Sequence, residues 1–209
     1  PVVQDNIRKL KNYGYEVITP ASGYLACGDT GAGKMPEPET LLEYILKEAA
    51  FQKDLAGKKL LVTAGPTQEA IDPVRCLTNH SSGKMGYAIA KMAMLRGAEV
   101  TLVSGPTAIE PPLFVKVIPV TSARDMFEAV TGLSDEQDII IKAAAVADYR
   151  PKQVSEDKVK KKDDQASIEL ERTDDILKYL GQHKKQGQFL CGFSMETRDM
   201  IRNSRAKLE

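Results

Sequence analysis

KLLVT (residues 59–63), KMGYAIAKMAMLR (84–96) and EVTLV (99–103) follow one another along the chain. The two outer segments are short apolar runs typical of buried strands, and the middle segment repeats apolar side chains at helical spacing. Gly97, directly after the middle segment, is a typical helix stop. The stretch therefore predicts a strand, a crossover helix and a second parallel strand, which together form a βαβ unit.

Three further apolar runs extend this pattern toward the C-terminus. We expect strands at Phe114–Val120, Asp138–Ala144 and Phe189–Phe193. Ser122–Val130 and Thr173–Gln182 are predicted helices, each opened by a hydroxyl residue suited to N-capping. The alternation predicts an α/β domain with a doubly wound, mostly parallel, Rossmann-like sheet.

Two segments depart from this alternation. Pro151–Gln165 is polar and contains Lys158, Lys160, Lys161 and Lys162, so we expect a lysine-rich, mobile flap. Residues 1–52 predict a short α/β piece with a helix, a strand at Val17-Ile18, a loop rich in glycine and proline, and a helix at Glu39–Ala50. Residues 53–57 are the expected linker, and residues 58–209 the main domain. Because the chain starts at Pro1 and ends inside a helical pattern, we expect an excised piece, truncated at its C-terminus.

Bulk composition excludes several classes of function. Lys plus Arg and Asp plus Glu number 29 each over 209 residues, so no global charge favours nucleic acid or an acidic membrane surface. Three widely spaced cysteines and two histidines form no zinc-like pattern. We find neither a signal peptide nor a membrane-length apolar run. We therefore expect a cytoplasmic protein that binds neither nucleic acid nor membrane.

Gly28–Lys34 fits the spacing of a phosphate-binding P-loop. Met35 stands where the hydroxyl that holds Mg²⁺ should be, and Pro36 and Pro38 follow where the supporting helix should begin. We therefore interpret the segment as a glycine-rich turn.

Stronger evidence for an anion site follows the first strand of the main domain. Gly65 begins a tight turn at the strand end, where open α/β sheets bind their ligands. Ser81, Ser82 and Gly83 then lead directly into a predicted helix, whose N-terminal amides favour an anion. Ordinary capping by the two serines is the alternative. Between turn and helix lie two side chains suited to stabilising a developing oxyanion, Asn79 and Arg75, although both could be structural.

A second group of candidates follows the fourth strand of the main domain. The small residues beginning at Ala144 would let a base or sugar lie close to the backbone, and Asp148 could hold Mg²⁺ through one carboxylate. The flap could close over a triphosphate, and Phe193 could offer an aromatic face to a base. The alternatives are a turn-forming aspartate, a solvated charge run and a core phenylalanine.

Five motifs occur in an order that resembles bacterial phosphopantothenoylcysteine synthetases. They are Thr63-Ala64-Gly65-Pro66-Thr67, Asp72-Pro73-Val74-Arg75, Asn79-His80-Ser81-Ser82-Gly83-Lys84-Met85-Gly86, Ala144-Ala145-Val146-Ala147-Asp148-Tyr149 and Lys158-Val159-Lys160-Lys161. The resemblance implies a ligase of coenzyme A biosynthesis that activates 4′-phosphopantothenate with CTP and Mg²⁺ to an acyl-cytidylate. Cysteine then displaces CMP. It also implies a homodimer.

Roles for single residues come from this resemblance. Asn79 and Arg75 should handle the acyl-cytidylate and the substrate. Contacts with CTP are implied for Asp148, Lys158, Asp174, Asp175, Ile176, Leu177, Phe193 and Lys207. Family members continue past the position of Glu209, so we expect nucleotide affinity and dimer contacts to depend on that continuation.

The N-terminal piece resembles the end of the FMN-dependent phosphopantothenoylcysteine decarboxylase that precedes the synthetase in cis in bacteria. Ala26-Cys27-Gly28-Asp29 and Gly33-Lys34-Met35-Pro36-Glu37-Pro38 carry this resemblance. It implies that Cys27 is the proton donor in the intact protein. We expect no decarboxylase activity from this piece alone.

Two rival functions remain. An NAD-dependent oxidoreductase would share the fold, but the G-x-G-x-x-G spacing is missing after Thr63 and no Tyr-x-x-x-Lys pair follows. A non-catalytic nucleotide-binding fragment would bind CTP without releasing pyrophosphate. Titration with NADH and CTP separates the first rival from the ligase, and pyrophosphate release separates the second.

Overall fold

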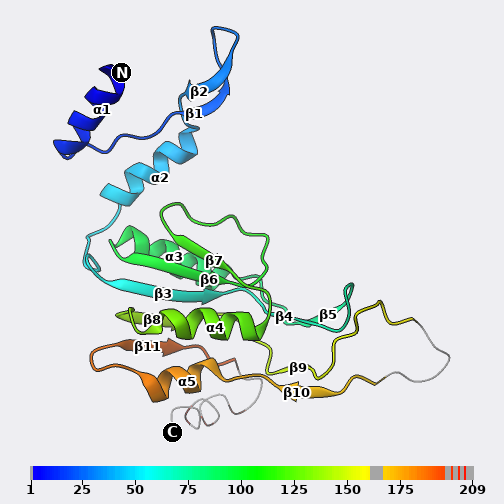
Figure 1. Cartoon of the computed structure of the whole chain (residues 1–209). Coiled ribbons are helices and arrows are strands. Elements are labelled where there is room, and N and C mark those ends of the chain that lie inside the picture. Colours follow the sequence, from blue (N-terminus) through cyan, green and yellow to red (C-terminus); the bar gives the residue numbers. More distant parts are fainter. Residues whose placement is uncertain (1, 161–166, 196–198, 200–201, 203–204, 206–209) are drawn as a thin grey trace. The chain divides into compact units, whose positions relative to one another are not determined.

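The computed structural model describes residues 2–160, 167–195, 199, 202 and 205. The chain divides into two compact units, residues 1–49 and residues 50–209, which are described in turn (Figure 1). Within the described residues, no helix is long and apolar enough to span a membrane.

The first unit contains two helices and a hairpin. Helix α1 is Val2–Asn12, and helix α2 is Pro38–Ala49. Strand β1 (Ala21–Tyr24) pairs antiparallel with β2 (Thr30–Lys34). The predicted strand at Val17-Ile18 is therefore wrong, and much of the predicted glycine-rich loop is a hairpin instead. Residues 30–34 lie in an extended strand, so the structure confirms that this segment is not a P-loop.

The second unit is built on a five-stranded parallel sheet, which confirms the predicted fold class. Its spatial order is β11 (Phe189–Gly192), β8 (Ile139–Lys142), β3 (Lys59–Ala64), β6 (Glu99–Ser104) and β7 (Lys116–Pro119). Strand β3, the first of the five in sequence, lies at the centre, and the chain builds outward on one side and then on the other. The strand order therefore reverses between β3 and β8, which is where such sheets bind their ligands.

Helices cover both faces of this sheet. Helices α4 (Ala123–Ser134) and α5 (Ile176–His183) enclose a core that includes Leu61 and Ile140. Helix α3 (Lys84–Leu95) packs against Ala64 through Gly86. Because side chains alternate along a strand, Ala64 and Leu61 lie on opposite faces of β3. The sheet is therefore doubly wound.

Several predicted boundaries are corrected by the structure. Helix α4 continues one turn past Val130, and its capping box is formed by Ser122 and Asp125. Helix α5 begins at Ile176 because the Asp175 carboxylate, rather than the Thr173 hydroxyl, caps its N-terminus. Strand β7 begins after Phe114, whose positive φ of 66° interrupts the extended backbone.

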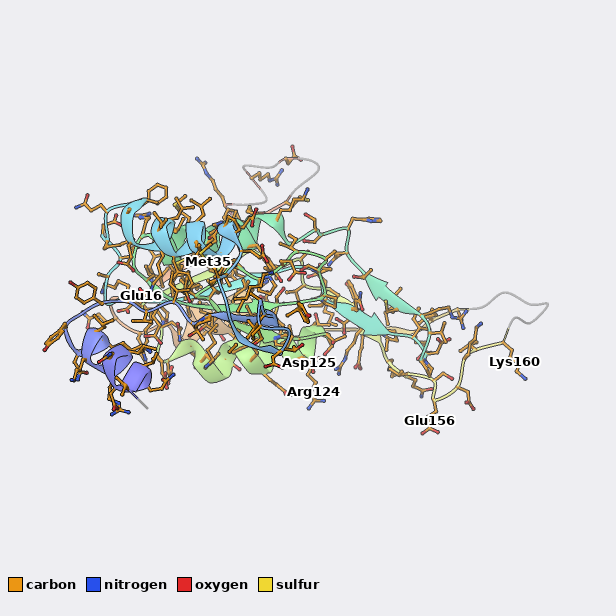
Figure 2. The ribbon with its side chains drawn as sticks, turned by 90° about the horizontal axis from the view of Figure 1, so that it is seen from above. Glu16, Met35, Arg124, Asp125, Glu156 and Lys160 are labelled. Carbon is orange, nitrogen blue, oxygen red and sulfur yellow. The ribbon has the colours of Figure 1, made fainter. Side chains whose placement is uncertain are left out.

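Two short antiparallel hairpins were not predicted. Strands β4 (Gln68–Ala70) and β5 (Cys76–Thr78) lie in the connection from β3 to α3. Strands β9 (Tyr149–Pro151) and β10 (Leu170–Arg172) lie on either side of the flap. Figure 2 shows Glu156 and Lys160 to the right of Arg124 and Asp125, on the side where the β4–β5 hairpin lies. The Ala123 amide at the start of α4 donates to the Glu69 carboxylate of this hairpin over 2.8 Å. The flap thus starts from a structured base, and the lysines at 161 and 162 lie outside the described residues.

Candidate functional site

The carboxyl ends of β3 and β8 are joined by a rigid backbone junction. A β-bridge links Pro66 to Ala145, the Ala145 amide donates to the Gly65 carbonyl over 2.9 Å, and the Thr67 amide donates to the Ala145 carbonyl over 3.1 Å. The buried hydroxyl of Thr67 also accepts a hydrogen bond of 2.9 Å from the Ala147 amide. The small residues that sequence analysis assigned to a nucleotide therefore lie at the switch point of the sheet.

Close packing of glycines fixes the turn after β3. Gly65 and Gly83 have φ values of 75° and 76°, where residues with a Cβ are strained. A Cβ on either glycine would lie 2.8 Å from the Thr107 Cγ2. A Cβ on Gly105 would lie 1.8 Å from the Pro66 carbonyl oxygen. Gly65 and Gly83 therefore hold the start of α3 close to the end of β3.

The contribution of residues 105–107 was missed by the sequence analysis. Gly105-Pro106-Thr107 follows β6 just as Gly65-Pro66-Thr67 follows β3, and the two turns pack together. The Thr107 hydroxyl donates to the Tyr87 hydroxyl over 3.1 Å, which ties this second turn to α3. The repeated Gly-Pro-Thr tripeptide was the sequence signal that could have predicted this second turn.

The start of α3 lacks a side-chain cap. Its N-cap residue is Gly83, with no side-chain hydrogen bond to the helix interior. The Ser81 hydroxyl accepts from the Gly83 amide at 3.3 Å, and the Ser82 hydroxyl contacts the Lys84 amide at 3.5 Å. These contacts are local and long, so they do not support the alternative in which the serines act as ordinary caps. Gly83 offers no side-chain cap to the amides that follow Lys84 in the first turn of α3, which suits an anion.

Asn79 connects the two halves of the switch point. Its Nδ2 donates to the Ala145 carbonyl oxygen over 3.0 Å, and the side chain is exposed. The preceding Thr78 hydroxyl donates to the Thr67 carbonyl over 2.8 Å. A carboxamide has two N–H hydrogens. One holds the end of β8, and the second can serve a bound carbonyl.

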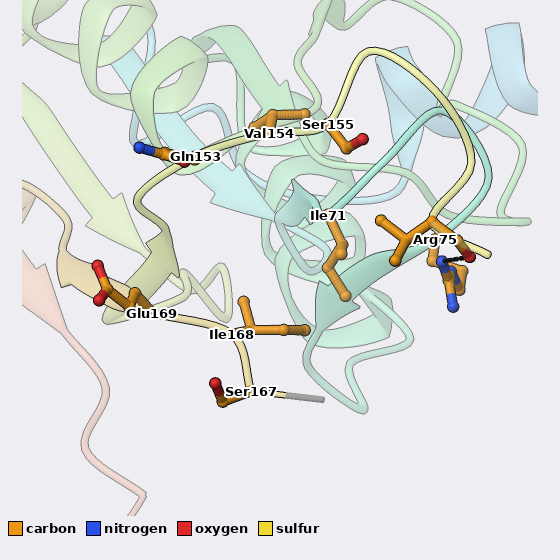
Figure 3. Close-up of a pocket in the computed structure, with 9 residues that line it drawn as sticks. Ile71, Arg75, Gln153, Val154, Ser155, Ser167, Ile168 and Glu169 are labelled. Atoms are coloured by element: carbon orange, nitrogen blue, oxygen red, sulfur yellow. Dashed lines mark hydrogen bonds between the residues drawn. The ribbon is translucent and has the colours of Figure 1, made fainter. Parts of the chain in front are cut away.

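Arg75 lies in a different environment from Asn79. Its Nε donates to the Asp72 carboxylate over 2.9 Å, and its Nη2 donates to the Val159 carbonyl over 2.8 Å. Arg75 also lines a pocket of about 500 Å³ between the β4–β5 connection and the flap (Figure 3). Ile71, Val154 and Ile168 contribute apolar walls to this pocket. The structure therefore places Arg75 at the base of the flap.

Several of the residues assigned to CTP lie where β8, α5 and β11 meet. The Thr173 amide donates to the Asp148 carbonyl over 3.0 Å, which brings Asp174 near Asp148. Leu177 packs on Gly192 at the end of β11, since a Cβ on that glycine would lie 2.7 Å from the Leu177 Cδ2. Phe193 follows with 54% of its surface exposed. These side chains form one corner of the carboxyl edge of the sheet.

The other assigned residues differ in their availability. Ile176 is 1% exposed and belongs to the core, so any ligand contact there would use its backbone. The Asp175 carboxylate is occupied as a helix cap. Lys158 is exposed in the flap, and Cys27 is exposed in the turn of the β1–β2 hairpin. Lys207 lies outside the described residues.

The carboxylates of this corner suit a metal that is held mainly by phosphates. No group of three or more His, Cys, Asp and Glu side chains that could hold a metal occurs in the part of the chain that the structure describes. Asp148 and Asp174 are both exposed, and a backbone hydrogen bond joins Asp148 to Thr173, the residue before Asp174. Mg²⁺ commonly binds through one or two carboxylates together with substrate phosphates and water, and the residues present fit that mode.

Fold and site together define a doubly wound, Rossmann-like α/β domain with its polar groups at the switch point. The connection between β3 and α3, residues 65–83, is unlike the short glycine-rich turn of NAD-binding domains. Residues 55–209 match the family model described as DNA/pantothenate metabolism flavoprotein C-terminal domain, and the chain belongs to this family. Residues 1–50 match the model described as Flavoprotein.

A named relative is similar in sequence over the length of this chain. The chain is 50% identical over 211 residues to the Coenzyme A biosynthesis bifunctional protein CoaBC of Bacillus subtilis (strain 168). The aligned region covers 100% of this chain and 52% of that protein. It thus spans about half the length of the curated relatives it matches.

Two solved structures are also similar. The C-terminal domain of a CoaBC protein is 55% identical with a TM-score of 0.65, covering 74% of this chain and 72% of that chain. A Cab2 mutant H337A in complex with phosphopantothenate-cysteine is 15% identical with a TM-score of 0.59, covering 82% of this chain and 76% of that chain. The second likeness concerns the fold alone.

Proposed function

We propose that this chain carries the ligase that joins 4′-phosphopantothenate to cysteine in coenzyme A biosynthesis, with CTP as the activating nucleotide. Family membership and the relatives named for coenzyme A biosynthesis support the proposal. The observation that carries it is the hydrogen bond from Asn79 to Ala145, which places an exposed carboxamide at the junction of β3 and β8. The uncapped start of α3 adds amides suited to a phosphate.

The proposed reaction has two steps. A carboxylate oxygen of 4′-phosphopantothenate forms a bond to the α-phosphorus of CTP, and the bond to pyrophosphate breaks. The amine of cysteine then forms a bond to the acyl carbon, CMP leaves, and the amine loses a proton. The first step brings anions together, so cationic groups are needed. The second step builds negative charge on the acyl oxygen, so a neutral donor is needed.

Residues of this chain supply both requirements. The amides at the start of α3 and the side chain of Lys158 bind phosphate oxygens. Asp148, with Asp174 beside it, would hold Mg²⁺, which neutralises triphosphate charge when it is bound. The second N–H of Asn79 Nδ2 donates to the acyl oxygen as charge develops. A neutral carboxamide lowers the energy of this charge without trapping the anionic substrate.

A test of this function uses the intact protein and the Asn79→Asp variant. The variant replaces an N–H donor by an anion beside the developing charge. Losing such a donor typically slows turnover by about 10²–10³-fold. We expect the variant to release pyrophosphate once and to accumulate acyl-cytidylate, with little product after cysteine is added. Rapid quench with labelled CTP measures this.

A control variant and two outcomes separate the proposed function from the role of Asn79. Asn12→Asp makes the same chemical change on the exposed surface of α1 and should leave turnover unchanged. If the unmodified protein releases no pyrophosphate with CTP and 4′-phosphopantothenate, the proposed function is wrong. If the Asn79→Asp variant forms product at the normal rate, only the role of Asn79 is wrong.

For the N-terminal unit, we propose a part in the decarboxylase that precedes the ligase in the relatives. The Flavoprotein match of residues 1–50 supports FMN as the cofactor of that half. Cys27, exposed in the hairpin turn, is the proposed proton donor in the intact protein. In the intact protein, Cys27→Ser should block formation of the protonated product of decarboxylation and leave pyrophosphate release intact. Loss of both activities would contradict this assignment.

We also propose that the ligase domain forms a homodimer. Apolar side chains are exposed on the second hairpin and near it, including Tyr149, Ile168 and Leu170. Such clusters usually mark an interface. Leu170→Asp should shift the protein from dimer to monomer in sedimentation velocity. Leu113→Asp, at a similarly exposed leucine in the connection from β6 to β7, is the control. An intact, unmodified protein that sediments as a monomer would refute the proposal.

A further inference from the structure

Asp72 is a buried carboxylate in the connection between β4 and β5. Its side chain is 0% exposed. Oδ1 accepts hydrogen bonds of 2.9 Å from the Val74 and Arg75 amides. Oδ2 accepts from the Arg75 guanidinium, with 2.9 Å to Nε, and from the Val159 amide over 3.1 Å. The Arg75 guanidinium holds the pKa of this carboxyl well below its usual range, so Asp72 is ionised at neutral pH.

Asp72 and Arg75 together hold both backbone groups of Val159. The carboxylate takes the N–H of Val159, and Arg75 Nη2 donates to its carbonyl oxygen over 2.8 Å. We name these three residues the Asp72–Arg75–Val159 latch. Two hydrogen bonds of opposite polarity fix the position and also the direction of the chain at residue 159. The latch is charge-assisted, and such hydrogen bonds are stronger than neutral ones.

The latch acts on the cationic part of the flap. Lys158 and Lys160 flank Val159 and are exposed. A second contact lies three residues earlier than Lys158, where the Ser155 amide donates to the Ile71 carbonyl over 3.0 Å. The turn that carries Asp72 is itself closed by a hydrogen bond of 2.8 Å from the Ile71 amide to the Arg75 carbonyl. A compact turn thus holds the flap at two points.

A purely local role explains only part of this arrangement. An aspartate often accepts hydrogen bonds from amides two and three residues ahead, as Asp72 does from Val74 and Arg75, and so forms a turn. Turn formation does not account for the contacts with Val159, which is 87 residues away. Those contacts relate the β4–β5 connection to the flap.

We propose that Asp72 is a positioning residue, which through the latch sets where Lys158 and Lys160 stand for binding the triphosphate. This inference rests on the proposed CTP-dependent function. Asp72 itself touches no substrate. It acts through Val159 and through the orientation that it imposes on the Arg75 guanidinium.

The Asp72→Asn variant separates the turn from the latch. The carboxamide oxygen can still accept from the Val74 and Arg75 amides, so the turn is kept. The carboxamide nitrogen in place of Oδ2 accepts neither from Val159 nor from Arg75. Asp138→Asn is the matched control, because that carboxylate also accepts a backbone hydrogen bond, 2.8 Å from the Lys59 amide, but lies away from the flap.

Limited trypsin digestion without nucleotide tests the latch independently of activity. Cleavage after Lys158 and Lys160, measured by mass spectrometry relative to cleavage after Lys184, should rise about tenfold in Asp72→Asn, because proteolysis follows the open population. Asp138→Asn should leave the ratio unchanged. A ratio in Asp72→Asn equal to that of the unmodified protein overturns the latch.

Kinetics of the intact protein test whether the latch affects CTP binding. The KM for CTP should rise about tenfold in Asp72→Asn, while the KM for cysteine stays within about twofold. A raised cleavage ratio with an unchanged KM for CTP overturns the positioning role. If Asp72→Asn does not fold, Val159→Pro removes the amide donor from the flap side, and cleavage after Lys160 should rise in the same way. Failure of the unmodified protein to use CTP would refute the proposed function. The trypsin cleavage ratio would then still show whether the latch holds the flap.

Discussion

Gly86→Ala should displace α3 from the central strand. Gly86 lies in the first turn of α3, where an added Cβ would be 2.5 Å from the Ala64 Cβ, 2.9 Å from the Thr63 carbonyl oxygen and 3.1 Å from the Ala64 Cα. Carbon atoms prefer about 3.5–4.0 Å, so the helix must retreat by about 1 Å. The neighbours are backbone atoms and a Cβ of buried β3, and none of them can rotate away.

Two opposing effects set the magnitude. Replacing glycine by alanine inside a helix stabilises by about 1 kcal/mol. Overpacking a rigid core costs about 1–3 kcal/mol, and a contact with backbone belongs to the upper part of that range. We therefore expect a net loss of about 1–2 kcal/mol. At about 2–4 °C per kcal/mol for a unit of this size, the Tm should fall by about 2–8 °C.

Gly132→Ala is the matched control for this prediction. Gly132 lies in α4, and a Cβ there meets nothing within 4 Å. Only the helix effect remains, so the Tm should rise by about 2–4 °C. Thermal unfolding followed by circular dichroism measures both variants. A Gly86→Ala protein that is as stable as the unmodified chain, or more stable, would refute the packing argument. Weaker CTP binding should accompany its destabilisation, because the start of α3 moves with the helix.

Three other predictions follow from the site. Asp148→Asn should weaken CTP binding in the presence of Mg²⁺ and change it little in EDTA; calorimetry with equal affinities for variant and unmodified protein would contradict the metal assignment. CTP with Mg²⁺ should protect the Lys158–Lys160 segment from trypsin, and equal cleavage with and without nucleotide would contradict closure of the flap. Because the folded pKa of Asp72 is lowered, its ionised form stabilises the protein above the unfolded pKa of about 3.9, and this contribution is lost as the pH falls further. The Tm difference between the unmodified protein and Asp72→Asn should therefore be constant from about pH 7 to 5 and shrink below about pH 4, and a difference that shrinks near pH 6 would point to another group.

Regular elements of the main domain were predictable because their apolar side chains repeat. The five strands of the sheet are short apolar runs, and α3 has a clear apolar face. Element ends were less predictable. Thr131 and Gly132 lie inside α4, although both residue types disfavour helices. The helix continues through them because Val130 packs in the core and Ser134, in the last turn, is also buried.

The short hairpins escaped prediction for a physical reason. Strand β2 consists of Thr30, Gly31, Ala32, Gly33 and Lys34, which has neither alternation nor β-branched residues beyond its first position. Strands β9 and β10 have three residues each and are separated along the chain by the flap. Their pairing depends on contacts between distant segments, which local composition does not reveal.

Motif order grouped the candidate site residues more clearly than any single residue pattern did. Asn79 and Ala144 come from motifs far apart in sequence, and the structure brings their segments together through the Ala145 carbonyl. Contacts with CTP and Mg²⁺ stay predictions. The packing role of Thr107 was missed because its value depends on Gly65 and Gly83, which meet only in the folded protein.

Asp72 and Arg75 are three residues apart, so an ion pair between them could be expected from the sequence, whereas their hold on Val159 could not. Their hydrogen bonds to Val159 join the motif at residues 72–75 to the motif at residues 158–161. Asn79 follows shortly after Arg75 on the strand-and-loop segment that carries the latch, and Lys158 lies next to its other end. Because the latch joins the β4–β5 connection to residue 159, a shift of this hairpin on substrate binding would move the base of the flap. In this arrangement, the buried carboxylate of Asp72 would couple occupancy near Asn79 to the position of Lys158 and Lys160, the lysines that we propose bind the triphosphate.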